Sequence, residues 1–122
     1  MKTKNKPFVY SNLLGQLRDE LQHLLNIQLT SDDDHNVDRI QAKWNALVNC
    51  CTKWIQIADN TLVNPYLRKK FHKEAKKELI NIGTIIISEL NTLSCKNTKA
   101  KFKKRKLIEE LNDRVKYIRS NY

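Results

Sequence analysis

Apolar residues recur along the first half of the chain with the alternating three- and four-residue spacing of one helix face. This spacing predicts a first helix over about 11–29, with Ser11 as its N-cap, and a second helix that opens after the polar, acidic segment 30–36. The stripe of the second helix is the clearest and consists of Val37, Ile40, Trp44, Leu47, Cys51, Trp54 and Ala58. A stripe of this length must be buried, either in the protein's own core or at a dimer seam.

A third helix is predicted where a capping residue precedes a proline. Asn64 is a good N-cap, and Pro65 at the first helical position has no hydrogen bond to lose there, so we expect a helix from Pro65 to about Leu93. Gly83 interrupts its apolar stripe. A glycine at such a position indicates a close approach to a neighbouring helix, or a bend.

The last apolar stripe predicts a fourth helix over about 99–120, with Thr98 as its N-cap. Short polar segments separate the four helices. We therefore expect an all-α fold, an antiparallel up-down four-helix bundle that forms a single domain of residues 1–122 with a short basic N-terminal tail at 1–10.

Charge is distributed unevenly along this predicted bundle. The 122 residues include 23 Lys and Arg against 13 Asp and Glu, a formal net charge of +10. Residues 1–65 hold 7 basic and 7 acidic side chains, whereas residues 66–122 hold 16 and 6. Lys69, Lys73 and Lys77 repeat at i, i+4 positions, where like charges destabilise a helix. Because solvation alone would favour mixed signs, we expect an external polyanion to compensate this charge.

Nucleic acid is the simplest such polyanion, since neutralised phosphates release their counterions. The spacing of a helix-turn-helix motif is absent, which favours RNA or a single strand over duplex DNA, and Phe102, surrounded by lysines, is the best candidate for stacking on a base. Phe71 and Tyr122 are expected in the core instead. In an up-down bundle the basic residues would form a track along the third and fourth helices. The predicted nucleic-acid-binding residues are Arg68, Lys69, Lys70, Lys73, Lys76, Lys77, Lys99, Lys101, Phe102, Lys103, Lys104, Arg105, Arg114 and Arg119.

One short pattern points to an enzyme. Arg18 and His23 form an Arg-x4-His pattern that resembles the active motif of HEPN ribonucleases, small helical domains that cut RNA without a metal. The resemblance implies a ribonuclease that uses these two residues. A separation of five residues, however, turns the side chains about 140° apart on a regular helix. Phosphate-binding loops and hydrolase motifs are absent, so we predict a non-catalytic binding protein without a cofactor.

The remaining features concern compartment and partners. Cys50, Cys51 and Cys95 have no metal-ligand spacing and are expected as reduced, buried thiols, and no apolar run approaches the roughly 18 residues of a membrane span. Polar residues interrupt any signal-peptide core after 1–10, so a cytoplasmic protein without a membrane partner is predicted.

In size, charge and helix count the chain resembles the small basic four-helix proteins that accompany reverse transcriptases or ribonucleoproteins in bacteria and phages. The predicted function is therefore that of a nucleic-acid-binding accessory protein in a ribonucleoprotein or in a mobile-element or phage complex, where an enzyme subunit is a second possible partner. The alternative is a helical protein-interaction module, which would bind an acidic protein or form a homo-oligomer.

Overall fold

The structure, a computed structural model, describes the backbone of residues 6–121 and the side chains from Val9 onward. The helices are α1 (Lys6–Leu25), α2 (Asp33–Thr61), α3 (Pro65–Asn91) and α4 (Thr98–Ser120), and the described residues contain no strand. The prediction of an all-α chain with four helices is confirmed. Within the part of the chain that the structure describes, no helix is long and apolar enough to cross a membrane. Residues 1–5 of the predicted tail and Tyr122 lie outside the described residues.

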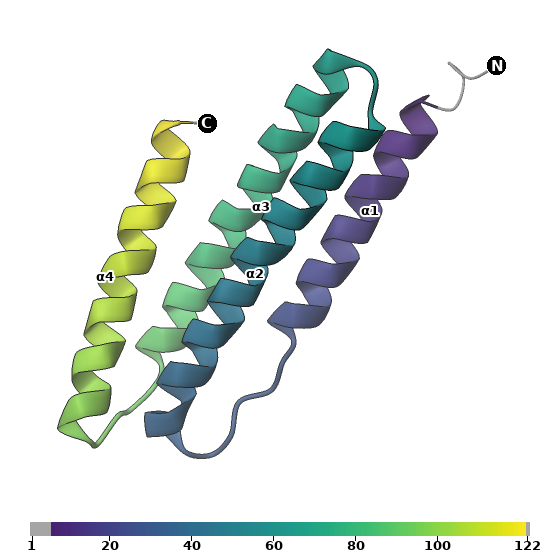
Figure 1. Ribbon diagram of the computed structural model, residues 1–122. Coiled ribbons are helices and arrows are strands. Elements are labelled where there is room, and N and C mark those ends of the chain that lie inside the picture. Colours follow the sequence, from purple (N-terminus) through teal and green to yellow (C-terminus); the bar gives the residue numbers. More distant parts are fainter. Residues whose placement is uncertain (1–5, 122) are drawn as a thin grey trace.

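The helices lie side by side, with α2 and α3 at the centre (Figure 1). One outer helix, α1, packs against both central helices from one side, and α4 packs against both from the other. Within the described residues, α1 and α4 do not contact each other. Figure 1 shows the α1–α2 and α3–α4 connections at one end of the molecule, and the α2–α3 connection at the opposite end.

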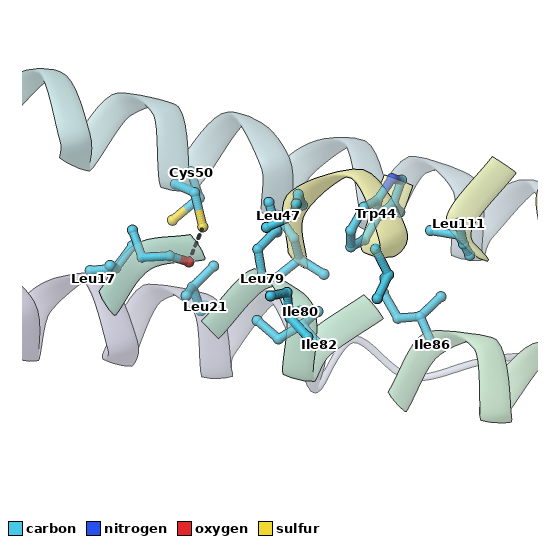
Figure 2. Close-up of a cluster of buried hydrophobic side chains, with 14 of the residues drawn as sticks. Leu17, Leu21, Trp44, Leu47, Cys50, Leu79, Ile80, Ile82, Ile86 and Leu111 are labelled. Carbon is cyan, nitrogen blue, oxygen red and sulfur yellow. Dashed lines mark hydrogen bonds between the residues drawn. The ribbon is translucent and has the colours of Figure 1, made fainter. Parts of the chain in front are cut away.

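The core is formed by the predicted stripes. Figure 2 shows Trp44 and Leu47 of α2 lying with Ile82 and Ile86 of α3 and with Leu111 of α4, and all five side chains are buried. The stripe of α2 is thus covered within the chain itself. Trp54 differs from its prediction as a fully buried stripe residue, since it is half-buried and its Nε1 donates a 2.9 Å hydrogen bond to Glu20.

Gly83 marks a close approach of α3 to α4, as the sequence predicted. A Cβ at this position would lie 2.7 Å from Cγ2 of Val115 and 3.6 Å from the Trp44 ring. Since real Cβ atoms do not come so near to another atom, only glycine fits the contact without a shift of the Val115 side chain or of α4.

The first helix begins earlier than predicted. α1 starts at Lys6, not at Ser11, so residues 6–10 belong to a helix and not to a tail. Tyr10 extends the buried face, because its ring packs edge-to-face against Phe71 with centroids 6.0 Å apart. Phe71 is fully buried, as predicted.

The start of α2 also lies earlier, at Asp33, so the predicted loop 30–36 is shorter. Asp32 is the N-cap and accepts a 3.0 Å hydrogen bond from the Asp34 amide. The next two carboxylates cap the α3–α4 connection instead. Asp33 accepts from the Ser94 amide at 2.9 Å, and Asp34 accepts from the amide of Lys96 at 2.9 Å.

A second correction concerns α4, whose N-cap is Asn97 and not Thr98. The Asn97 side chain accepts hydrogen bonds from the amides of Lys99 and Ala100, at 2.7 and 3.4 Å. Asp34 accepts from the Asn97 amide at 3.2 Å, which fixes Asn97 in the capping position. The choice between two adjacent capping residues is therefore decided by a contact with α2.

Lys43 is a buried cation that ties three elements together. Its side chain is only 2% exposed and its ammonium donates to Glu89 of α3 at 3.2 Å. It also donates to the carbonyl oxygens of Leu25 and Ile27, at 3.2 and 3.5 Å, where α1 ends. These acceptors satisfy a charge that would otherwise be costly to bury.

Candidate nucleic-acid interface

The predicted binding residues form two clusters at opposite ends of the α3–α4 pair. The six residues on α3 lie in its first half, next to the α2–α3 connection, and the residues from Lys99 to Arg105 lie at the α3–α4 connection (Figure 1). Arg114 and Arg119 lie in the second half of α4. The contact of Val115 with Gly83 places that half of α4 beside α3. We call the α3 residues with Arg114 and Arg119 the first cluster, and the 99–105 residues the second cluster.

The acidic residues of α3 pair with cations of neighbouring helices. Glu78 accepts a 2.8 Å hydrogen bond from Nε of Arg18 on α1, and Glu74 accepts one of 3.3 Å from the same guanidinium. Glu89, the third carboxylate of α3, is bound to Lys43. All three glutamates of α3 are therefore matched with cations on neighbouring helices.

The lysines of α3 face solvent. Lys69, Lys70, Lys73 and Lys77 are exposed, and Lys76 is half-buried. Among residues 6–121, the side chains of Lys69, Lys76 and Lys77 have no ion-pair partner. The outcome is a segregation of charge across one helix, with partly exposed carboxylates paired to neighbouring helices and ammonium groups on the outer surface.

Most of the α3 residues of the first cluster line a hollow of about 790 Å³. Asp59 is the one acidic residue among its described lining, and it contacts Nε2 of His72 at 2.9 Å. The basic residues that line the hollow are Arg68, Lys69, Lys70, Lys73 and Lys76. A concave surface lined by one sign of charge concentrates the electric field and attracts anions.

Three predicted ligands also have structural partners. Arg68 donates to the carbonyls of the α2–α3 connection, 2.8 Å to Leu62 and 3.0 Å to Val63. Lys104 donates to the Leu93 carbonyl at 2.7 Å, and Lys103 pairs with Asp38 of α2 at 3.2 Å. Arg68 and Lys104 therefore also hold the connections in place. The sequence could not show this, because the acceptors are carbonyls whose direction the fold decides.

The second cluster has an exposed aromatic ring at its centre. Phe102 is 57% exposed, and the Lys106 ammonium lies 5.8 Å from its ring centroid. A hollow of about 410 Å³ at the start of α4 is lined in part by Lys101, Lys104 and Arg105. Phe102 is therefore exposed, as a ring that stacks on a base must be.

The clusters are not joined along α4 into one track. Glu109, Glu110 and Asp113 are exposed and occupy the middle of the helix, between the basic residues at its two ends. The expected continuous track is thus divided by an acidic band, because the few carboxylates of this helix are gathered at its centre.

A cavity that the sequence did not indicate lies where α4 ends. Its volume is about 260 Å³, and α2, α3 and α4 all contribute to its walls. Lys76 and Arg114 line it together, so the two halves of the first cluster meet there. Tyr117, also in the lining, is 66% exposed. Three helices build this site from residues far apart in the chain, which leaves no local signal.

The candidate catalytic pair is not assembled. Arg18 is bound to Glu74 and Glu78, whereas His23 is exposed, and no interaction in the described part of the chain joins the two. Burial raises the pKa of Cys51 to about 12 and that of Cys50 to about 11, so neither thiol is an activated nucleophile. Residues 6–121 include no group of His, Cys, Asp and Glu arranged to hold a metal ion.

No protein-family model, curated protein or solved structure matches this chain.

Proposed function

We propose that this protein is a non-catalytic accessory protein that binds RNA or single-stranded nucleic acid through α3 and α4. The observation that carries the proposal is the segregation of charge on α3, where three partly exposed carboxylates are paired with Arg18 and Lys43 of neighbouring helices while lysines cover the outer surface. The carboxylates of α3 are thus unavailable to offset the positive charge of that surface. A phosphate backbone supplies the missing negative charge and gains free energy through counterion release.

The two clusters would engage one strand together. In an antiparallel up-down bundle the end of α4 returns toward the first half of α3, which the cavity shared by Lys76, Arg114 and Asn121 supports. At about 1.5 Å per residue, the centres of the two clusters lie roughly 20 Å apart along α4, a span of a few nucleotides. A strand that contacts both clusters would place its bases, and not its phosphates, against the acidic band of α4. Alternatively, it would run over the uncharged part of α3. Three free, unpaired cysteines fit a cytoplasmic ribonucleoprotein or mobile-element complex, because reduced thiols are typical of that compartment.

A salt titration tests the proposal. We expect the affinity for a single-stranded RNA of arbitrary sequence to fall steeply with salt, and the logarithmic slope to decrease by about 0.7 for each phosphate that a variant no longer neutralises. The variant Lys69→Gln/Lys77→Gln should lower this slope, because both side chains are exposed in the first cluster. Arg39→Gln removes an exposed charge from α2, outside both clusters, and should leave the slope unchanged.

Binding that is independent of salt, or unchanged after both clusters are neutralised, would exclude a nucleic acid as the ligand. Binding restricted to acidic proteins under the same conditions would instead establish the interaction-module alternative.

A further inference from the structure

The cavity where α4 ends combines an apolar floor with a basic rim. Its floor is formed by side chains such as Val48 and Ile55 of α2 and Leu79 of α3. Figure 1 shows α4 ending short of the α2–α3 connection. Residues of the last turns of α4 line the cavity together with α2 and α3.

The rim combines positive charge from two helices with one aromatic ring. Lys76 approaches from α3 and Arg114 from α4, and the lining includes no acidic residue among those that the structure describes. Tyr117 exposes 66% of its surface at the same rim. Cations beside an exposed ring are the combination with which proteins hold the phosphates and bases of single strands.

The polar groups of the lining retain capacity for hydrogen bonds. Thr52 donates its hydroxyl hydrogen to the Val48 carbonyl at 3.1 Å, which leaves its oxygen lone pairs as acceptors. Asn121 donates from Nδ2 to the Tyr117 carbonyl at 2.8 Å, which leaves Oδ1 as an acceptor. Acceptors at the edge of an apolar cavity match the amino groups on the edge of a base.

From these observations we propose that the cavity binds one unpaired base, with Tyr117 stacked on it and with Lys76 and Arg114 on the adjoining phosphates. The volume of about 260 Å³ is below the range of about 300–1,000 Å³ typical of sites for larger ligands, and it fits a single ring system. This inference rests on the proposed function and specifies it further: the ligand is single-stranded, because a base within a duplex cannot enter the cavity.

Fluorescence anisotropy with a labelled oligo(A) of about 12 nucleotides tests the inference, with an abasic chain of the same length as the second probe. We expect Tyr117→Ala to weaken oligo(A) binding by about tenfold and to leave the abasic chain unaffected. Tyr117→Phe keeps the ring and should bind oligo(A) as the unchanged protein does.

A second variant fills the cavity without a change to the core. Thr52 is exposed at the edge of the cavity, so Thr52→Trp should block it and reproduce the loss of oligo(A) affinity. Asn49→Trp is the matched control, because Asn49 is exposed on the same helix and does not line the cavity. Circular dichroism confirms that each variant is folded.

Two results would overturn the inference. If oligo(A) and the abasic chain bind equally, and Tyr117→Ala has no effect while Lys69→Gln/Lys77→Gln still lowers the salt slope, the cavity takes no base and the proposed function stands. Suppose instead that no nucleic acid binds, and that an acidic amphipathic peptide binds the unchanged protein but not the Thr52→Trp variant. The cavity then belongs to a protein partner, and the proposed function fails as well.

Discussion

Substitution of Gly83 by alanine tests the closest helix contact in the fold. The added methyl would lie 2.7 Å from Cγ2 of Val115 and 3.6 Å from the Trp44 ring. Val115 is only 7% exposed, and a β-branched side chain in a helix has one strongly preferred rotamer. Because a change of rotamer is unfavourable for this side chain, the clash must be relieved by a strained Val115 or by a shift of α4.

Two opposing effects determine the size of the change. Overpacking a buried contact costs about 1–3 kcal/mol, whereas alanine in place of glycine within a helix gains about 0.5–1 kcal/mol. Gly83→Ala should therefore lower the free energy of unfolding by about 1–2 kcal/mol. Gly15 provides the matched control, because a Cβ there meets nothing within 4 Å, and Gly15→Ala should stabilise the protein by about 0.5–1 kcal/mol.

Urea unfolding followed by circular dichroism measures both variants against the unchanged chain. Addition of Val115→Ala to the Gly83→Ala variant should show favourable coupling between the two positions, since it removes the clashing methyl. If Gly83→Ala and Gly15→Ala stabilised the protein equally, α4 would not pack on α3 at this position, and the location of Arg114 beside Lys76 would be wrong too.

Three further predictions concern buried groups. Leu47→Ala should cost about 2–5 kcal/mol in urea unfolding because Leu47 is fully buried, and a loss below about 0.5 kcal/mol would contradict the packing of α2. Lys43→Met should cost about 2–3 kcal/mol by the same measurement, because the hydrogen bonds of the buried ammonium are removed. Lys53→Met is the control at an exposed ion pair and should cost under about 1 kcal/mol. Equal losses in the two variants would refute the structural role of Lys43. The buried thiols of Cys50 and Cys51, with pKa raised to about 11 and about 12, should react with a thiol reagent at pH 8 only after unfolding. The free energy of unfolding should fall as the pH rises above about 9, because the thiols ionise there in the unfolded chain but not yet in the folded one.

Local sequence signals located some helix boundaries and missed others for a physical reason. The Asn64–Pro65 pair predicted the start of α3 correctly, because both preferences act within the first turn. Asn97 and Thr98 are both residues that cap helices well. Asp34, which is far away in the chain, accepts a hydrogen bond from the Asn97 amide and so selects Asn97 as the cap. Likewise, the early residues of α1 become a helix with a buried face through the contact of Tyr10 with α3.

The candidate interface was predictable in composition but not in orientation. Counting charges shows that α3 and α4 carry the excess, yet the direction of Glu74 and Glu78 depends on Arg18, whose helix lies beside α3 only in the folded chain. Periodicity likewise cannot place the acidic band of α4 relative to its neighbours. The cavity at Tyr117 depends on where α4 ends against two other helices, which is a property of the packed structure alone.

The separation of α1 from α4 within the described residues has a consequence for the cooperativity of folding. The outer helices α1 and α4 each pack on the α2–α3 pair and not on one another. Neither outer helix therefore needs the second one in order to remain docked. Local unfolding can therefore release α4 while α1, α2 and α3 stay together, or release α1 while the other three do. The amide hydrogens of α2 and α3 would then be the slowest to exchange, because both modes of opening leave this central pair intact.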